Sequence, residues 1–490
     1  MFLGLDLGTS ELKALVLDDK HQVLATAHVA LQLSHPQPLW SEQAPQDWWQ
    51  ATQTVMAQLL AAHPSLMKRI RAIGLSGQMH GAVLLDADEQ VLRPAILWND
   101  GRSGPQCDRL SQALPELAQI SGNLAMPGFT APKLMWVAEH EPEVFSRIAR
   151  VLLPKDWLRL KLTGEAVSDV SDASGTLWLD VDKRDWSELL LKASGMRISQ
   201  MPRLVEGSHA SAPLLPAWVD AWGLQGEVIV AGGAGDNAAS AVGMGLVNPG
   251  EGFVSLGTSG VVFVSGERFV PNPAKAVHAF CHALPGRWHQ MSVMLSAASA
   301  VSWACRQLGY ANEASLLADA ATLDIQRRTQ APLFLPYLSG ERSPHNNPQA
   351  CGGWLHLRTV HERADLAYAV VEGVSWGLKD GWQALDASQS PCSGLSLVGG
   401  GSRSAWWAQL LADVLGVPLR IHEGGATGGA LGAARLGWLA VGGSVEEVCI
   451  QPPVAQVFKP QDLEEGIARR YDLFAQAYQQ LYSRADQKRS

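Results

Sequence analysis

Two aspartates stand where a carboxylate could take part in phosphoryl transfer. Asp6 ends an apolar, strand-like run and lies directly before the turn Gly8-Thr9-Ser10, which could point backbone N–H groups and hydroxyls toward a phosphate. An acidic side chain beside such a turn would repel the phosphate unless a divalent metal lay between them. We therefore interpret Asp6 as a metal-side carboxylate, with a capping or turn role as the alternative.

The second aspartate, Asp236, follows a strand-like run and a glycine turn over residues 229–235 and stands at the expected start of a helix. A helix N-terminus favours an ionised carboxylate. At the edge of a cleft, such a carboxylate could accept the proton of a substrate hydroxyl as that oxygen attacks phosphorus. An N-cap aspartate without a catalytic role is the alternative interpretation.

Three short segments combine aromatic rings with polar side chains. They are Ser-Gly-Gln-Met-His-Gly at 76–81, Trp-Ser-Glu-Gln at 40–43 and Trp-Asn-Asp-Gly-Arg at 98–102. Rings that cover C–H faces and polar groups that bind hydroxyls suit a polyhydroxylated sugar. Taken alone, His80 could be a satisfied structural histidine and Trp98 a core residue, so the clustering only suggests a sugar site.

A short repeat links the two halves of the chain. Leu-Gly-Thr-Ser at 7–10 reappears at 256–259, and in both places apolar runs flank it, at 2–7 and 12–17 and at 252–256 and 261–264. These patterns predict two β-hairpins with Gly-Thr-Ser tips, one at the head of each half. Turn residues at 248–250 place the boundary between a domain of residues 1–248 and a domain of residues 249–490.

The elements around these motifs alternate between strand-like and helical patterns, which indicates an α/β fold. Further strands are expected at 72–76, 81–86, 227–232 and 395–399. The glycines at 399–401 run from a strand end into a helical segment, an arrangement that could hold a nucleotide or be a plain turn. Apolar residues at helical spacing from Leu463 to Leu481 predict a C-terminal packing helix.

Charge and composition narrow the function classes. The formal charge is -9 and the pI is about 5.9, which argues against a nucleic-acid binder. The chain opens without a basic segment and a long apolar run, and its longest apolar stretch, at 228–247, contains Asp236, Asn237 and several glycines. We therefore expect a cytoplasmic enzyme without membrane spans. It also lacks a GxxxxGK[ST] phosphate loop and a protein-kinase catalytic loop.

These pieces, in this order, resemble the FGGY carbohydrate kinases over nearly the whole chain. Two longer stretches carry the resemblance, Gly-Phe-Thr-Ala-Pro-Lys-Leu-Met-Trp-Val-Ala-Glu-His at 128–140 and residues 352–372, which end Asp-Leu-Ala-Tyr-Ala-Val-Val-Glu. The resemblance implies an α/β fold of two ribonuclease H-like domains, as in the actin-like ATPase superfamily, with the active site in the cleft between them. The substrates would be ATP with Mg²⁺ and a small sugar, and a homodimer is possible.

Within this family, the resemblance assigns roles to matching residues. Asp236 would be the proton acceptor, and Asp6 would assist at the metal and phosphate, with Mg²⁺ held by both, directly or through water. The implied sugar contacts are Gln78, Met79, His80, Trp98, Asp100, Asp236 and Asn237. The implied nucleotide contacts are Gly8, Thr9, Ser10, Gly257 and Thr258 at the phosphates and Gly400, Gly401 and Arg403 near the nucleoside.

Segments 78–81, 98–102 and 335–342 are most similar to family members that phosphorylate D-xylulose, which implies transfer to its O5. Other FGGY substrates such as ribulose, fuculose, gluconate or glycerol remain alternatives. A noncatalytic sugar- or nucleotide-sensing protein, or a filament-forming actin-like protein, would be a different class on the same fold.

Two positions depart from the family pattern. Residue 356 is His where Gly is usual, and a glycine there could adopt a positive φ that His tolerates poorly. Residue 11 is Glu where Gly often follows the Thr-Ser pair, which adds a negative charge beside a phosphate turn. We expect Glu11 to point to solvent.

Overall fold

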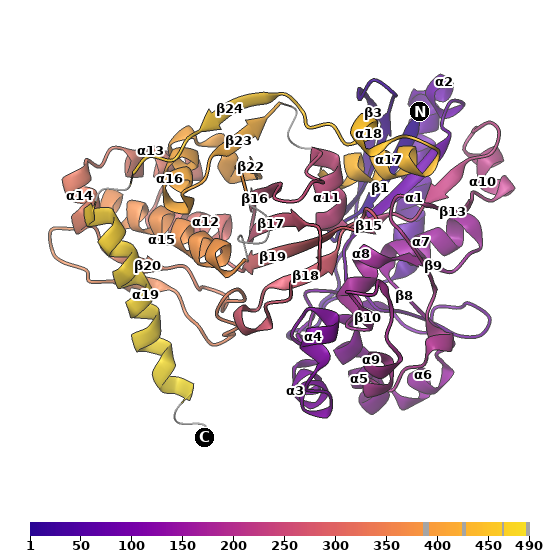
Figure 1. Cartoon of the computed structure of the whole chain (residues 1–490), viewed down its shortest axis with the longest axis horizontal. Coiled ribbons are helices and arrows are strands. Elements are labelled where there is room, and N and C mark those ends of the chain that lie inside the picture. Colours follow the sequence, from indigo (N-terminus) through magenta and orange to yellow (C-terminus); the bar gives the residue numbers. More distant parts are fainter. Residues whose placement is uncertain (386–391, 424–427, 463–464, 487–490) are drawn as a thin grey trace.

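The computed structural model describes residues 1–385, 392–423, 428–462 and 465–486. Two sheets organise these residues, one in each half of the chain (Figure 1). The first sheet runs β13 (Ala210–Pro213), β14 (Ile229–Ala231), β5 (Ala72–Gly77), β1 (Phe2–Leu7), β2 (Glu11–Leu17) and β3 (Val23–Ala30), with β15 (Ala234–Gly235) paired to β5. The second runs β18 (His278–Cys281), β19 (Trp288–Met294), β17 (Gly260–Gly266), β16 (Gly252–Leu256), β22 (Leu395–Val398), β23 (Leu419–His422) and β24 (Val454–Phe458).

Helices surround both sheets, which confirms the α/β prediction. Those before residue 250 are α1 (Pro45–Ala62), α2 (Pro64–Met67), α3 (Gly104–Ala113), α4 (Leu117–Ser121), α5 (Thr130–His140), α6 (Pro142–Arg147), α7 (Pro154–Thr163), α8 (Val170–Ala173), α9 (Glu188–Ala193), α10 (Pro216–Ala221) and α11 (Asp236–Met244). Those after it are α12 (Ala298–Gln307), α13 (Glu313–Ala321), α14 (Ile325–Gln330), α15 (Arg363–Ala384), α16 (Ala405–Leu415), α17 (Gly428–Ala440), α18 (Val445–Val448) and α19 (Glu465–Asp486).

Short strand pairs complete the fold. They are β4 (Glu42–Gln43) with β7 (Ala95–Ile96), β6 (Val83–Leu85) with β8 (Arg150–Leu152), β9 (Val167–Asp169) with β12 (Arg203–Val205), β10 (Leu179–Asp180) with β11 (Asp185–Trp186), and β20 (Leu333–Leu335) with β21 (Gly353–Leu355). The strands expected at 72–76, 81–86, 227–232 and 395–399 are all present, with bounds that differ by one or two residues.

The two predicted hairpins are confirmed. Strand β1 pairs antiparallel with β2 from Phe2↔Leu17 to Leu7↔Leu12, and β16 pairs antiparallel with β17 from Gly252↔Val264 to Leu256↔Gly260. Nearly all side chains of β1 are buried on both faces of the sheet, so its apolar run is almost continuous.

One helix of the second half packs on a face of the first sheet. Figure 1 shows α17 beside β1 and α11, away from the second sheet. A Cβ added at Gly4 of β1 would collide with the carbonyl oxygen of Ala430, and one at Gly74 of β5 with that of Ala433. Glycine is required at both positions because the helix backbone lies directly on the strands. The domain boundary at residue 248 stays a prediction, and α17 crosses that boundary in space.

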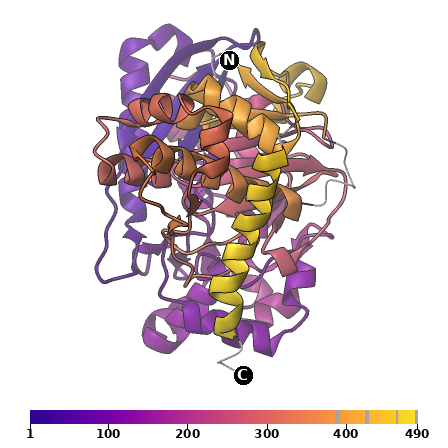
Figure 2. The same cartoon turned by 90° about the vertical axis from the view of Figure 1, so that its left-hand side faces the viewer.

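The C-terminal helix α19 packs along the second half as predicted, and Figure 2 shows it running down that side of the molecule. Phe474 and Tyr478 are buried against the core of that half. Arg470 Nη2 lies 2.6 Å from Glu372 Oε2 on α15, and both side chains are buried. Leu481 was wrongly included in the packing face, because it is 51% exposed near the end of the helix. Leu463 lies outside the described residues.

His356 has a φ of +61°, so the concern raised by the sequence is confirmed. A side chain in the left-handed region costs about 1 to 2 kcal/mol relative to glycine. Among the residues that the structure describes, no helix has both the length and the apolar character needed to cross a membrane.

Candidate active site beside the first hairpin

Three predicted site segments leave the same edge of the first sheet. Strands β1 and β15 both run parallel to β5, with Leu7 and Gly235 each aligned on Gly77. The turn after β1, the loop after β5 and the first residue of α11 therefore emerge side by side. Gln78 N donates to Leu7 O at 2.8 Å, which fixes the loop against the turn.

Asp236 is the first residue of α11, as the sequence predicts. Its Oδ1 accepts hydrogen bonds from Asn237 N at 2.7 Å and Asn237 Nδ2 at 2.9 Å. Burial, together with the charge of Asp6, raises the pKa of Asp236 to about 6, although the bonds from Asn237 oppose the shift. A carboxylate with this pKa is ionised at neutral pH and can still act as a base.

Asp6 faces the start of α17. A Cβ added at Gly429 would lie 2.6 Å from Asp6 Oδ2, so only glycine lets the helix approach the carboxylate. Burial raises the pKa of Asp6, and the charge of Lys13 opposes the shift. Because Asp6 and Asp236 interact electrostatically, a divalent cation held by both would relieve their repulsion. These two carboxylates fit the predicted metal side.

Side chains hold the first hairpin tip in place. Gln43 Nε2 donates to Thr9 O at 2.7 Å, while Gln43 Oε1 accepts from Gln78 Nε2 at 3.0 Å. The Thr9 hydroxyl donates to Gln78 Oε1 at 3.1 Å and accepts from Trp98 Nε1 at 2.9 Å. Gly8 N donates to Glu11 O at 3.0 Å, and Ser10 at the tip is exposed. The predicted sugar contacts Gln78 and Trp98 thus hold the turn at residues 8–10.

The second tip is held by backbone groups. Thr258 O accepts from Ala297 N at 3.1 Å and from the Ser299 hydroxyl at 2.8 Å, and Gly257 O accepts from Ala298 N at 2.9 Å. The start of α12 therefore fixes the turn. Thr258 is exposed, so its hydroxyl is accessible to a ligand.

The loop after β5 presents Met79 and His80. His80 Nδ1 donates to Gly175 O at 2.6 Å, and burial lowers the pKa of His80 to about 3. The ring is therefore neutral, with its Nε2 lone pair free to accept a hydroxyl proton. The carbonyl of His80 accepts from Lys133 Nζ at 2.9 Å, and a Cβ added at Gly235 would lie 2.8 Å from the Met79 sulfur.

Asp100 is placed differently from the other predicted sugar contacts. It is buried, and its Oδ2 accepts from Ser41 N at 2.7 Å and from Arg102 Nη2 at 2.7 Å. The Arg102 guanidinium also lies 3.7 Å from the centre of the Trp40 ring. Because these groups occupy its carboxylate, Asp100 holds the 98–102 loop in place, and a direct sugar contact stays a prediction. Trp98 is 41% exposed beside Thr9.

The predicted nucleoside residues lie on the second half. Gly400, Gly401 and Arg403 line a cavity of about 620 Å³, together with α12, α13 and the start of α16. Val301, Leu317 and Trp406 supply apolar surface, and Asn312 and Glu313 supply polar groups. This mixture suits a planar base and a ribose. A smaller cavity of about 190 Å³ is lined by Asn237 of α11, Ser255 of β16 and Gly428 of α17, and so touches both halves.

Sequence reasoning missed several residues that shape the site. Gly429 contacts Asp6 from the far end of the chain, and Lys133 fixes the carbonyl of His80. Lys133 belongs to the 128–140 stretch that carries the family resemblance, which was a usable signal. Arg342 Nη1 lies 3.4 Å from His278 Nε2, and its charge contributes to the lowered pKa of His80. Glu11 is 35% exposed and pairs with Lys13 at 2.8 Å instead of pointing freely to solvent.

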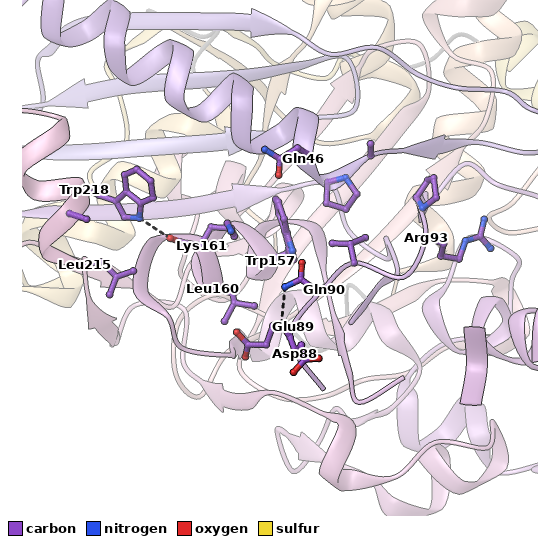
Figure 3. Close-up of a pocket in the computed structure, with 15 residues that line it drawn as sticks. Gln46, Asp88, Glu89, Gln90, Arg93, Trp157, Leu160, Lys161, Leu215 and Trp218 are labelled. Carbon is purple, nitrogen blue, oxygen red and sulfur yellow. Dashed lines mark hydrogen bonds between the residues drawn. The ribbon is translucent and has the colours of Figure 1, made fainter. Parts of the chain in front are cut away.

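A roomier cavity of about 750 Å³ lies elsewhere in the first half (Figure 3). Trp157 and Lys161 of α7 and Trp218 of α10 line it, with Gln46 and the loop at 88–94. None of the predicted catalytic, sugar or nucleotide residues contributes to its walls, so size alone does not locate the active site.

Together, an actin-like ATPase fold, paired glycine hairpins and a buried carboxylate at a sheet edge are what a two-domain sugar kinase requires. Residues 1–243 match the N-terminal domain of the FGGY family of carbohydrate kinases, and residues 252–441 match its C-terminal domain. The chain belongs to this family and is an ATP-dependent carbohydrate kinase.

Known proteins that match nearly the full length of this chain are also sugar kinases. A xylulose kinase of Escherichia coli is 50% identical, covering 98% of this chain and 99% of its own, and one of Klebsiella pneumoniae is 49% identical over 98% and 99%. A solved structure from Brucella ovis, described as a xyloylose kinase, has a TM-score of 0.93 at 48% identity, with 99% of both chains covered.

Proposed function

We propose that this carbohydrate kinase transfers the γ-phosphoryl group of ATP to O5 of D-xylulose, giving D-xylulose 5-phosphate and ADP. The observation that carries the sugar assignment is the 50% identity, over nearly all of both chains, to a xylulose kinase. The first domain, residues 1–248, would bind the sugar, and the second, residues 249–490, would bind the nucleoside.

Asp236 is the proposed base. Its carboxylate would accept the O5 proton as that oxygen attacks phosphorus, a contribution on the order of 10² to 10⁴-fold to the rate. His80 Nε2, Asn237 and Met79 would orient the sugar beside it. The two hairpin tips would hold the phosphates through Gly8, Thr9, Gly257 and Thr258, while Gly400, Gly401 and Arg403 would lie near the nucleoside.

Asp6 and Asp236 are the residues that would hold Mg²⁺ directly or through water. When bound, the ion would supply charge neutralisation at the phosphates. We further propose that the enzyme acts in the cytoplasm on small molecules, without nucleic-acid or membrane partners, and that it can form a homodimer.

The test is ADP release from ATP and Mg²⁺ with D-xylulose, D-ribulose, L-ribulose, L-fuculose, gluconate and glycerol, each against a blank without sugar. We expect a strong preference for D-xylulose. Preference for another compound would keep the kinase and overturn the sugar. No ADP release with any of the six compounds would favour a noncatalytic sensor.

A further inference from the structure

One short segment is bonded to both the base and the sugar loop. Ser171 of α8 accepts a hydrogen bond from Gly235 N at 3.2 Å, and Gly235 directly precedes Asp236. Four residues further along, Gly175 O accepts the bond from His80 Nδ1 at 2.6 Å. The position of the base relative to the sugar loop therefore depends on Ser171 Oγ and Gly175 O, which none of the sequence motifs include.

The Ser171 hydroxyl has a defined direction. Its proton is donated to Asp169 Oδ1, so its lone pairs face Gly235 N. Asp169 also caps α8, since the same oxygen accepts from Ser171 N at 2.9 Å and Asp172 N at 3.1 Å. An acceptor fixed in this way holds the amide before Asp236 without needing to reorient.

A buried ion cluster anchors this segment. Lys155 Nζ lies 2.6 Å from Asp156, 2.6 Å from Asp169 and 2.9 Å from Asp172, and all four side chains are fully buried. The three carboxylates are close enough to bind a metal, but the lysine ammonium lies among them and Arg159 pairs with Asp156. Burial also raises the pKa of Asp172, so these groups already offset the negative charge. The cluster is therefore a structural foundation.

The same cluster reaches the catalytic turn by a second route. Arg159 lies 2.8 Å from Asp156 and donates from Nη2 to the carbonyl of Gly232. Gly233, next in the turn, has a φ of +77° that favours glycine. The turn from β14 to Asp236 is thus held at its start by Arg159 and at its end by Ser171.

We propose that Ser171 is a positioning residue for phosphoryl transfer, fixing Asp236 relative to the sugar loop through the amide of Gly235. This inference rests on the proposed role of Asp236. Ser171 would not touch either substrate. Its loss would let the base shift, and a displacement near 1 Å can cost about 10²-fold in rate.

The kinetic test compares Ser171→Ala with Ser174→Ala. Ser174 is also fully buried on this segment, but it bonds Val170 O and Cys281 N, away from the turn. We expect Ser171→Ala to lower kcat about 10- to 100-fold with the KM for ATP within about twofold, and Ser174→Ala to change kcat less than about threefold. Equal losses in both variants, or an unchanged kcat in Ser171→Ala, would overturn the proposal.

A second variant separates loss of the hydrogen bond from misfolding. A second measurement, amide hydrogen exchange, tests the positioning role independently of which sugar is the substrate. Ser171→Cys keeps a weak acceptor of similar size and should recover part of the lost kcat, whereas a kcat no better than that of Ser171→Ala would count against the hydrogen bond. Amide hydrogen exchange of a peptide covering residues 232–237 should become faster in Ser171→Ala and stay unchanged in Ser174→Ala. Unchanged exchange in both would overturn the positioning role even if no sugar is phosphorylated.

Discussion

The two glycine-tipped hairpins have the same Gly-Thr-Ser sequence and nearly the same strand geometry, yet different groups hold them. Side chains of Gln43, Gln78 and Trp98 support the first tip. Backbone amides at the start of α12 and the Ser299 hydroxyl support the second. The first tip is therefore bonded to the loops that carry the predicted sugar contacts, and the second is bonded to the start of α12.

The chemistry of the two hairpins differs as well. Asp6 precedes the first tip, where Ser255 occupies the matching position of the second. The first tip spans residues 8–11, because Leu7 pairs with Leu12. The second spans only residues 257–259, because Leu256 pairs with Gly260. The repeat thus duplicates a turn shape, while the carboxylates stand beside the first turn only, where we propose that the proton transfer takes place.

The largest expected effect is the loss of Asp236, because the second hairpin has no carboxylate that could replace it. Asp236→Ala should fold and bind ATP but lose about 10² to 10⁴-fold in sugar-dependent turnover. In the wild type, kcat/KM should fall as the pH drops below about 6, because the base becomes protonated. Turnover, nucleotide binding and the pH profile check this, and near-normal turnover in the variant would reject Asp236 as the base.

The second prediction compares the matching positions Asp6 and Ser255 directly. Asp6→Asn should lower kcat about 10²-fold and raise the Mg²⁺ concentration needed for half-maximal rate. The low-pH limb should also move to lower pH, because the charge of Asp6 raises the pKa of Asp236. Ser255→Ala is the matched control, with an expected change below about threefold. Similar losses in both variants would contradict the functional asymmetry.

A smaller effect is expected when the side chains that support the two hairpin tips are removed. Gln43→Ala removes the bonds to Thr9, Gln78 and Trp48 and should raise the KM for ATP about 3- to 10-fold, with a lower Tm. Ser299→Ala removes one exposed bond to Thr258 and should change the KM less than about twofold. A larger effect of Ser299→Ala would reverse the comparison.

The smallest effect concerns Glu11, the charged residue of the first tip. Glu11→Gln should tighten ATP binding about twofold at low salt, because it removes a negative charge near the phosphates, and the gain should fade as ionic strength rises. The pair with Lys13 at 2.8 Å limits the effect. Glu267→Gln, an exposed charge change at the end of β17, is the control. A gain that survives high salt would point to a conformational cause.

The sequence predicted those parts of the site that a pattern within one short stretch of residues reveals. A repeat identified both hairpins, and a strand, a glycine turn and a helix start identified the place of Asp236. The missed parts depend on contacts between distant segments. Gly429 reaches Asp6 across the whole chain, and Ser171 reaches Gly235 through a segment of ordinary composition. The misjudged packing of Leu481 shows that helical spacing alone cannot tell where the neighbouring core ends.

The placement of α17 on β1 and β5 has a consequence for biosynthesis. A nascent chain that has formed the first sheet lacks the helix that covers one of its faces until residue 440 has left the ribosome. A fragment of residues 1–248 should therefore bind a dye specific for exposed apolar surface, and the full chain should not. Strand β1 is synthesised first, but α17, the helix that covers it, is synthesised near the end of the chain.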